Sequence, residues 1–188
     1  MLKDEVAKAL KVLQDGGIIL YPTDTIWGIG CDATNAEAVK KVYALKQRDE
    51  AKSLIVLVDT DNKLPSYITE VPDIAYDLIE YAESPLTLVM PGAKNLAPNL
   101  IAEDGSVGLR VTSHEFCKQL IQRFRKPIVS TSANISGQPS PKNFSGVADE
   151  IIEGVDYVVD VDQHDMTEKK PSTIMRLEPD GRFEFIRR

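Results

Sequence analysis

Residues 16–25 read GGIILYPTDT, and this stretch indicates the class of fold. The four apolar residues 18–21 are typical of a strand buried on both faces, and Pro22 ends the strand because proline cannot donate to a sheet ladder. Three short polar side chains, Thr23-Asp24-Thr25, follow at the carboxyl end. Open α/β sheets hold ligands at the carboxyl ends of their strands, so the stretch predicts a buried strand that leads into a binding site.

Helices and strands alternate on both sides of this stretch. The predicted helices are one that ends at Asp15, one that begins after Thr34 or Asn35, one that begins near Pro72, residues 114–124 capped by Ser113, and residues 148–153. The predicted strands are residues 53–58, 86–90, 107–111, 127–132 and 157–161, with a hairpin of residues 173–176 and 183–186 around Pro179-Asp180-Gly181. This alternation predicts a single α/β domain over residues 1–188, a sandwich built on a mixed sheet.

Composition excludes several classes of protein. The chain has 188 residues, of which 43% are hydrophobic and 27% charged, so it can bury a core and is not disordered. Its net charge of −7 argues against a protein whose main work is to coat nucleic acid or an anionic membrane. The two cysteines form no CxxC pair, which excludes a disulfide framework. The charged start and the lack of a long apolar stretch predict a soluble, cytoplasmic protein with no membrane partner.

Three cations gather where the second helix meets the next strand. Residues 46–53 read KQRDEAKS, so Lys46, Arg48 and Lys52 can converge on a polyanion such as a nucleoside triphosphate. We expect them to lie on a junction loop and to contribute little to the core. The alternative is a solvated helix end, where cations favour the helix dipole.

Hydroxyl and amide side chains follow two apolar strands. Besides Thr23-Asp24-Thr25, the run Ser130-Thr131-Ser132-Ala133-Asn134 ends a second strand. Two such ends facing one cleft favour a site, although ordinary turn chemistry would also use these residues. Arg110 stands inside the apolar strand 107–111, where it is either exposed at a sheet edge or buried as a clamp on a carboxylate or phosphate.

No metal site is predicted. His114 and Cys117 have helical spacing, but two ligands do not make a zinc site. The chain has neither a GxxxxGK[ST] loop nor a GxGxxG motif, so ordinary P-loop and Rossmann chemistry have no support.

Five motifs in order resemble one known family, the YrdC-like threonylcarbamoyl-AMP synthases. They are YPTDT with WGIG at 21–30, KxR at 46–48, GLR at 108–110, STSANxSG at 130–137 and PSTI at 171–174. The resemblance covers nearly the whole chain, and five spaced motifs are far more specific than any single one.

The resemblance implies a twisted mixed sheet with flanking helices and a large concave, cationic cavity. It implies condensation of L-threonine, bicarbonate and ATP into threonylcarbamoyl-AMP and pyrophosphate. This product is the donor for threonylcarbamoyladenosine in tRNA, so the implied partners include tRNA threonylcarbamoyl-transfer proteins. Any direct binding of tRNA is expected to be weak and to fall with salt.

Site residues are implied by the same motifs. Threonine would be held by Thr25, Arg110, Ser132 and Ser172, with Arg110 on its carboxylate. ATP would be held by Lys46, Arg48, Lys52 and Asn134, flanked by Ser106 and Lys142. Lys46 and Arg48, with a Mg²⁺ ion carried by ATP, would stabilise the developing pyrophosphate, since positioning and charge neutralisation suffice for phosphoryl-type transfer.

The chain departs from the family pattern at three positions. Asp24 stands where Glu is common, Ser53 where Pro is common, and Leu57 where His is common. The His often contacts threonine, which leaves amino-acid affinity or selectivity open here. Longer members carry an additional C-terminal domain, for which 188 residues leave no room.

Two other functions remain open at the level of sequence. One is an RNA-binding or ribosome-assembly module that uses the same cationic cavity without chemistry, against which the net charge of −7 counts. The other is a related carbamoyl-adenylate enzyme with a different acceptor or donor, as in the related domain that handles carbamoyl phosphate. The run Ser132-Ala133-Asn134 favours the synthase.

Overall fold

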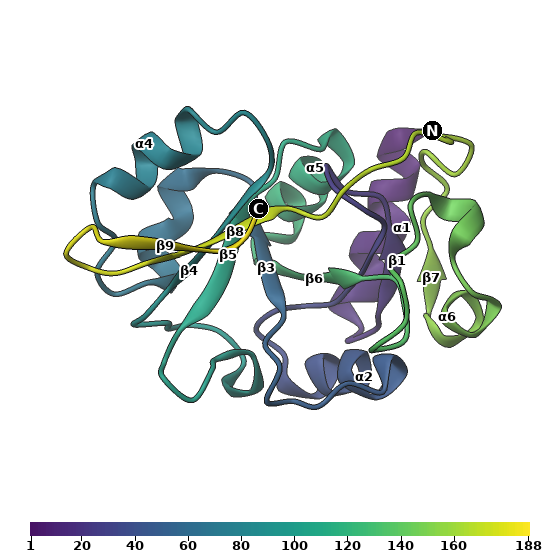
Figure 1. Cartoon of the computed structure of the whole chain (residues 1–188). Coiled ribbons are helices and arrows are strands. Elements are labelled where there is room, and N and C mark those ends of the chain that lie inside the picture. The colour runs from purple at the N-terminus through teal and green to yellow at the C-terminus, as the bar shows by residue number, and fades with distance from the viewer.

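Nine strands form one mixed sheet in the computed structural model, which describes residues 1–188 (Figure 1). In chain order they are β1 Ile19–Tyr21, β2 Gly28–Gly30, β3 Ile55–Val58, β4 Leu86–Met90, β5 Val107–Val111, β6 Ile128–Ser132, β7 Tyr157–Val158, β8 Thr173–Leu177 and β9 Phe183–Arg187. Their order across the sheet is β7-β1-β2-β6-β3-β5-β4-β8-β9. The pairs β1–β7, β3–β5 and β4–β8 are parallel and the other five are antiparallel. The predicted mixed α/β sheet is confirmed.

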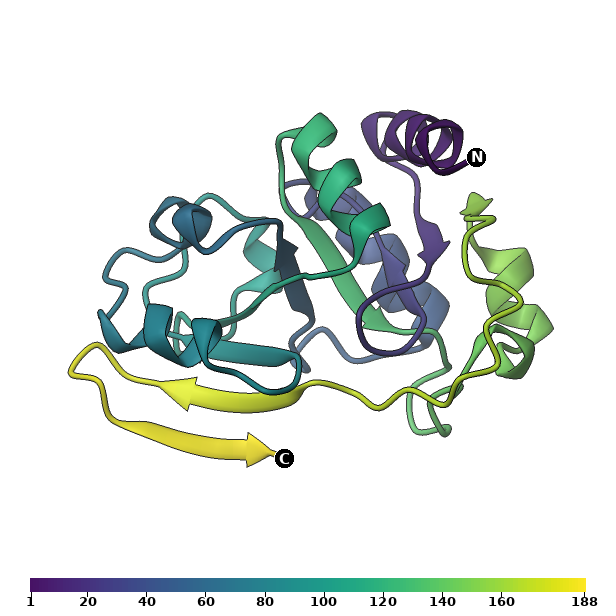
Figure 2. The ribbon, with the colours of Figure 1, turned by 90° about the horizontal axis from the view of Figure 1, so that it is seen from above.

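Helices cover both faces of this sheet. They are α1 Leu2–Gln14, α2 Ala36–Lys46, α3 Leu64–Tyr67, α4 Ile74–Glu80, α5 Glu115–Phe124 and α6 Asp149–Gly154. On one face α1 and α5 lie side by side over a core of 13 buried residues (Figure 2). On the other face α2 and α4 pack against a larger core of 29 buried residues. None of the six helices has the length and apolar character needed to cross a bilayer.

Local signals place most of these elements. Strands β4 and β5 have the predicted bounds, and Asn35 caps α2 by accepting hydrogen bonds from the amides of Glu37 and Ala38. The cap of α5 is His114 instead of Ser113, and β7 ends at Val158 instead of residue 161.

Strand β2 was not predicted, because GIG is too short to show a period. It needs glycine at position 30, where a Cβ atom would overlap the carbonyl oxygen of Val129 and the ring of Tyr21. The Tyr21 hydroxyl donates to that same carbonyl at 2.8 Å, so β1, β2 and β6 pack closely at this point.

Strand register determines which side chains share a face with the site. Leu57 on β3 pairs with Arg110 on β5, which pairs with Thr87 on β4. Leu57 belongs to the core under α1 and α5, so Arg110 and Thr87 point to that same face. They lie beyond the helices, where the sheet is left open to form a cavity.

Candidate active site

A cavity of about 200 Å³ lies on this open part of the sheet. Three arginines line it, and no aspartate or glutamate does. Its hydroxyl-bearing residues are Thr25, Ser53, Ser130, Thr131, Ser132, Ser140 and Ser172. Sites for drug-sized ligands usually measure roughly 300–1,000 Å³, so a nucleotide bound here would extend past the enclosed part. The lining chemistry suits a small polar anion.

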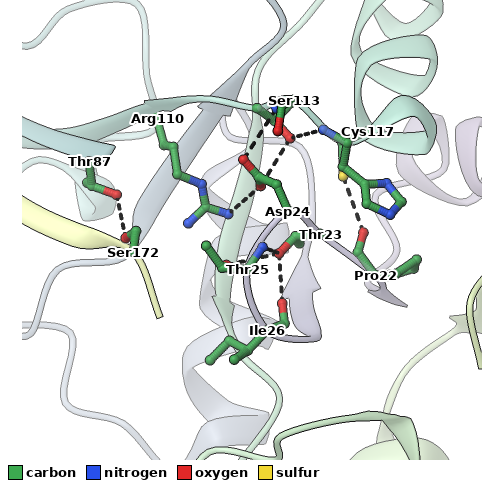
Figure 3. Close-up of polar contacts among 12 residues, drawn as sticks. Pro22, Thr23, Asp24, Thr25, Ile26, Thr87, Arg110, Ser113, Cys117 and Ser172 are labelled. Atoms are coloured by element: carbon green, nitrogen blue, oxygen red, sulfur yellow. Dashed lines mark hydrogen bonds and ion pairs between the residues drawn. The ribbon is translucent and has the colours of Figure 1, made fainter. Parts of the chain in front are cut away.

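Arg110 is buried, and its partner is a carboxylate of the same chain. Its side chain is 3% exposed, and its Nη2 atom lies 3.2 Å from Oδ1 of Asp24 (Figure 3). Asp24 also accepts hydrogen bonds from the Thr112 hydroxyl at 3.2 Å and the Ser113 amide at 3.3 Å. The alternative of an arginine exposed at an edge is therefore wrong. The Nε atom of Arg110 is buried without a partner, and the residue lines the cavity.

The strand end after Pro22 is both a turn and part of the cavity wall. The Thr23 hydroxyl donates to the carbonyl of Ile26 at 2.7 Å and accepts from the Thr25 amide at 2.9 Å. Thr25 thereby faces the cavity from a fixed position. Across the cavity, the hydroxyls of Thr87 and Ser172 lie 2.8 Å apart (Figure 3). Two strand ends and the start of β8 therefore present hydroxyls to one space.

Arg187 also lines the cavity, although the sequence did not predict this role. It is on β9, and its Nε and Nη2 atoms donate to the carbonyl of Ser172 at 3.0 and 2.8 Å. Burial, together with the nearby Arg110 guanidinium, lowers the pKa of Arg187. Two guanidiniums that repel each other in one cavity favour an anionic ligand. One feature of the sequence could have indicated Arg187. It lies in the strand that forms a hairpin with the strand directly after Ser172.

Arg48 lies on the cavity as predicted, and its arm is held by the chain. Its Nε and Nη2 atoms donate to the carbonyls of Lys52 and Ser53, both at 3.1 Å.

Lys46 does not lie on an exposed junction, and that expectation is wrong. Helix α2 extends to Lys46, whose side chain is 1% exposed. Its ammonium donates to the carbonyls of Ser132 and Asn134 at 2.5 and 2.6 Å. Burial, and to a smaller extent the charge of Arg48, lowers the pKa of Lys46 to about 8. Lys46 is not among the residues that line the cavity.

The structure does not bring four other predicted ATP residues to the cavity wall. Lys52 is exposed beside it, and Lys142 pairs with Glu168 at 2.9 Å on the surface. The Ser106 hydroxyl donates to Asp104 at 2.6 Å. Asn134 uses its amide group to close its own loop, and its Oδ1 atom has no partner. Their roles toward ATP stay predictions.

Leu57 has no access to the cavity. It is fully buried in the core with Phe116 and Ile128 and is not a lining residue. In this structure the Leu57 side chain is therefore not placed to contact threonine in the cavity. The two helical residues that were weighed as a metal pair also have other partners: His114 lies 3.0 Å from Asp162, and Cys117 donates to the carbonyl of Pro22. No group of three or more His, Cys, Asp or Glu side chains is placed to hold a metal ion.

Comparisons with known proteins agree on one family. A model of the Sua5, YciO and YrdC proteins, described as telomere recombination, matches residues 11–188. A threonylcarbamoyl-AMP synthase of Pseudoalteromonas translucida is 38% identical over 172 residues, which are 90% of this chain and 91% of that protein.

Solved structures agree with the fold. The crystal structure of P. abyssi Sua5 complexed with L-threonine superposes with a TM-score of 0.81 at 28% identity, covering 92% of this chain and 50% of that one. The present chain thus spans about half the length of that protein. The crystal structure of E. coli YciO has a TM-score of 0.85 at 21% identity and covers 100% of this chain and 89% of that one, which is a likeness of fold.

Proposed function

The chain belongs to the Sua5/YciO/YrdC family, and we propose from its cavity that it is an L-threonylcarbamoyladenylate synthase. Such an enzyme forms threonylcarbamoyl-AMP and pyrophosphate from L-threonine, bicarbonate and ATP. The observation that carries the proposal is the lining itself, with three arginines, many hydroxyls and no carboxylate. An amino-acid carboxylate and a triphosphate are the anions such a lining can bind together.

Arg110 is the residue proposed to hold the threonine carboxylate. Asp24 fixes one nitrogen of the guanidinium, while Nε is left without a partner next to the cavity. Hydroxyls of Thr25 and Ser172 border the same space and can pair with the polar groups of threonine. Binding of L-threonine by P. abyssi Sua5 supports this assignment for the present chain.

The proposed reaction needs positioning more than a protein nucleophile. The threonine amine adds to bicarbonate with loss of water, and an oxygen of the resulting carbamate displaces pyrophosphate from the α-phosphorus of ATP. Arg48 and Arg187 lie on the cavity where they can offset the growing negative charge of pyrophosphate.

Mg²⁺ enters the proposal as part of the substrate, Mg-ATP. The carboxylate of Asp24 is already paired with the lining residue Arg110, and the polar side chains of the lining are arginines and neutral hydroxyls. Such an ion prefers negatively charged oxygens, so phosphate oxygens would supply them.

A substrate-omission assay tests the function. Pyrophosphate and threonylcarbamoyl-AMP are followed by mass spectrometry with all three substrates, and then without threonine or without bicarbonate. We expect both products only in the complete mixture. Pyrophosphate release that is unchanged without threonine would contradict the synthase, and product formation from carbamoyl phosphate would favour the related carbamoyl-adenylate chemistry.

The product is a reactive mixed anhydride, so a transfer protein that acts on tRNA is proposed as the next partner. Direct binding of tRNA to this chain is expected to be weak and to fall steeply with salt, because it would rest on phosphate contacts. Tight binding that resists salt would favour the RNA-binding module instead.

A further inference from the structure

Lys46 holds the loop that follows β6 from several sides. This loop, residues 132–138, is called the Ser132 loop below. The Lys46 ammonium lies 2.5 Å from the carbonyl oxygen of Ser132, 2.6 Å from that of Asn134 and 3.4 Å from the Ser132 hydroxyl. The backbone carbonyl of Lys46 in turn accepts from the Ser136 amide at 2.8 Å. One residue therefore contacts the loop at three successive points.

The ammonium has no donor left for a ligand. A lysine has three donor hydrogens, and three oxygens of the Ser132 loop surround this one. The side chain is 1% exposed and does not reach the cavity. A phosphate could bind it only after these contacts break.

Stability alone does not account for a lysine at this place. The partners of the ammonium are oxygens of Ser132 and Asn134 and not a carboxylate, and the charge that acts on its pKa is the guanidinium of Arg48. A buried charge costs free energy that an apolar side chain of similar size would avoid. The charge therefore has its role in holding the loop whose carbonyls it binds.

The loop it binds carries part of the cavity wall. Ser132 lines the cavity, and the carbonyls of Ser132 and Asn134 accept from the ammonium of Lys46, which is not a lining residue. Asn134 closes the loop from the other side by donating to the carbonyls of Ile135 and Gln138 at 3.0 and 2.8 Å.

We propose that Lys46 is a positioning residue: its ammonium holds the carbonyls of Ser132 and Asn134 and so fixes the cavity wall at Ser132 together with Asn134, a residue predicted to bind ATP, without touching the nucleotide itself. This inference rests on the proposed function for the identity of the ligand. It replaces the direct contact between Lys46 and ATP that the KxR motif suggested.

The test compares Lys46→Met and Lys46→Arg with Lys40→Met, a matched change at an exposed lysine of the same helix. Amide hydrogen exchange of residues 132–138 is measured without ligand, and ATP affinity is measured by calorimetry without threonine. In Lys46→Met we expect exchange in the loop to be at least about tenfold faster. ATP affinity should fall by about 10- to 100-fold, the usual worth of a hydrogen bond to a charged group. Lys40→Met should change neither.

A pH titration of the wild-type chain adds a reading that needs no variant. ATP affinity should weaken as pH rises through about 8, where Lys46 loses its proton, and should be flat in Lys46→Met and Lys46→Arg. Because the folded pKa lies below the usual value of 10.5, the folded chain releases this proton first, and stability from this residue rises between about pH 8 and 10.5. Affinity and stability thus move in opposite directions, which a merely structural lysine would not cause.

Three results would overturn the proposal. Lost ATP affinity with unchanged exchange in Lys46→Met would mean direct contact with the phosphates. Faster exchange with unchanged ATP affinity would mean a structural role only. If Lys46→Met does not fold, a wild-type affinity that is flat from pH 7 to 9.5 would also reject it. A wild-type chain that binds no ATP would instead contradict the proposed function, while the exchange comparison would still decide whether Lys46 orders the loop.

Discussion

Arg110 and Asp24 form the only ion pair of the chain in which both side chains are buried. Charged groups are buried in this way when each has enough partners to offset lost hydration. Asp24 has three, and Arg110 keeps an unpaired Nε beside the cavity. The pair is therefore complete on the side of the aspartate, whereas the guanidinium keeps an unused donor.

Replacement of Arg110 by lysine should lower threonine affinity much more than ATP affinity. A lysine keeps the charge but cannot bind Asp24 and a carboxylate as a fork. A lost charge-assisted contact costs ~2–5 kcal/mol, so we expect a threonine affinity about 30-fold or more below that of the wild type. Calorimetry with each substrate measures both effects. A threonine affinity within about threefold of the wild type would remove Arg110 from the threonine site.

Asp24→Asn tests whether this carboxylate orients Arg110. Thr112 and Ser113 donate to different oxygens of Asp24, so asparagine, with one acceptor oxygen, can keep only one of these two bonds, and it no longer carries the charge that attracts the guanidinium. We expect kcat/KM for threonine to fall by about 10- to 100-fold, since a hydrogen bond between charged groups is worth ~1.5–3 kcal/mol. Asp24→Glu, which keeps the charge, should recover part of it. Equal losses in Asp24→Glu and Asp24→Asn would show that shape, and not charge, matters here.

At the scale of elements, Glu5 joins helix α1 to the edge strand β7 and to the residues that follow it. Its carboxylate accepts from the Tyr157 hydroxyl at 2.5 Å and from the Asp160 amide at 2.8 Å, and it pairs with Lys8 at 2.8 Å. Burial by itself would raise the pKa of Glu5, but hydrogen bonds from Lys8, Tyr157 and Asp160 outweigh it and lower the pKa to about 2. The link between α1 and β7 therefore depends on an ionised glutamate.

Glu5→Gln should make the chain less sensitive to acid. The folded pKa of about 2 lies below the usual 4.5, so the stabilisation by Glu5 is complete above about pH 4.5 and is lost as pH falls toward 2. At pH 7 we expect the variant to be ~1–3 kcal/mol less stable, a range that allows for solvent screening at Lys8, which is largely exposed. Urea unfolding at pH 7, 4 and 3 measures this. A gap between variant and wild type that stays constant down to pH 3 would contradict it.

The elements themselves were largely predictable. Strands β4 and β5 follow from short apolar runs bounded by proline, glycine or polar residues, and α2 from its Asn35 cap. Strand β2 was not, because three residues show no periodicity and its place depends on close packing of Gly30 against Tyr21 and Val129.

At the scale of the whole molecule, the fold brings three arginines to one cavity in a chain of net charge −7. Arg48 follows α2, Arg110 is on β5 and Arg187 is on β9. The β8–β9 hairpin, which extends along one edge of the sheet, carries the last of them (Figure 2). Local positive charge at the cavity thus coexists with a negative surface elsewhere.

Arg187→Met should weaken the binding of inorganic pyrophosphate, and Arg182→Met on the exposed turn of the same hairpin should not. We expect a loss of about tenfold or more from Arg187→Met at low salt, because a guanidinium at a sheltered site is worth more than one in water. For the wild type, affinity should fall as salt rises from 50 to 300 mM, as the Debye length shortens. Similar effects of the two changes would mean that only the overall charge of the hairpin matters. Calorimetry measures pyrophosphate affinity for the wild type at low and high salt and for each of the two variants at low salt.

By itself, the sequence determined most of the strands and helices and the hydroxyl-rich strand ends, because apolar periodicity, caps and turn residues act over a few neighbours. It also indicated that Arg110, if buried, needs an anionic partner. Only the tertiary structure decided that this partner is Asp24, that Lys46 is buried under the Ser132 loop and that Arg187 reaches the cavity. These outcomes depend on which distant strands pair and in which register. A register shift of one residue in β5 or β9 would turn Arg110 or Arg187 to the other face of the sheet.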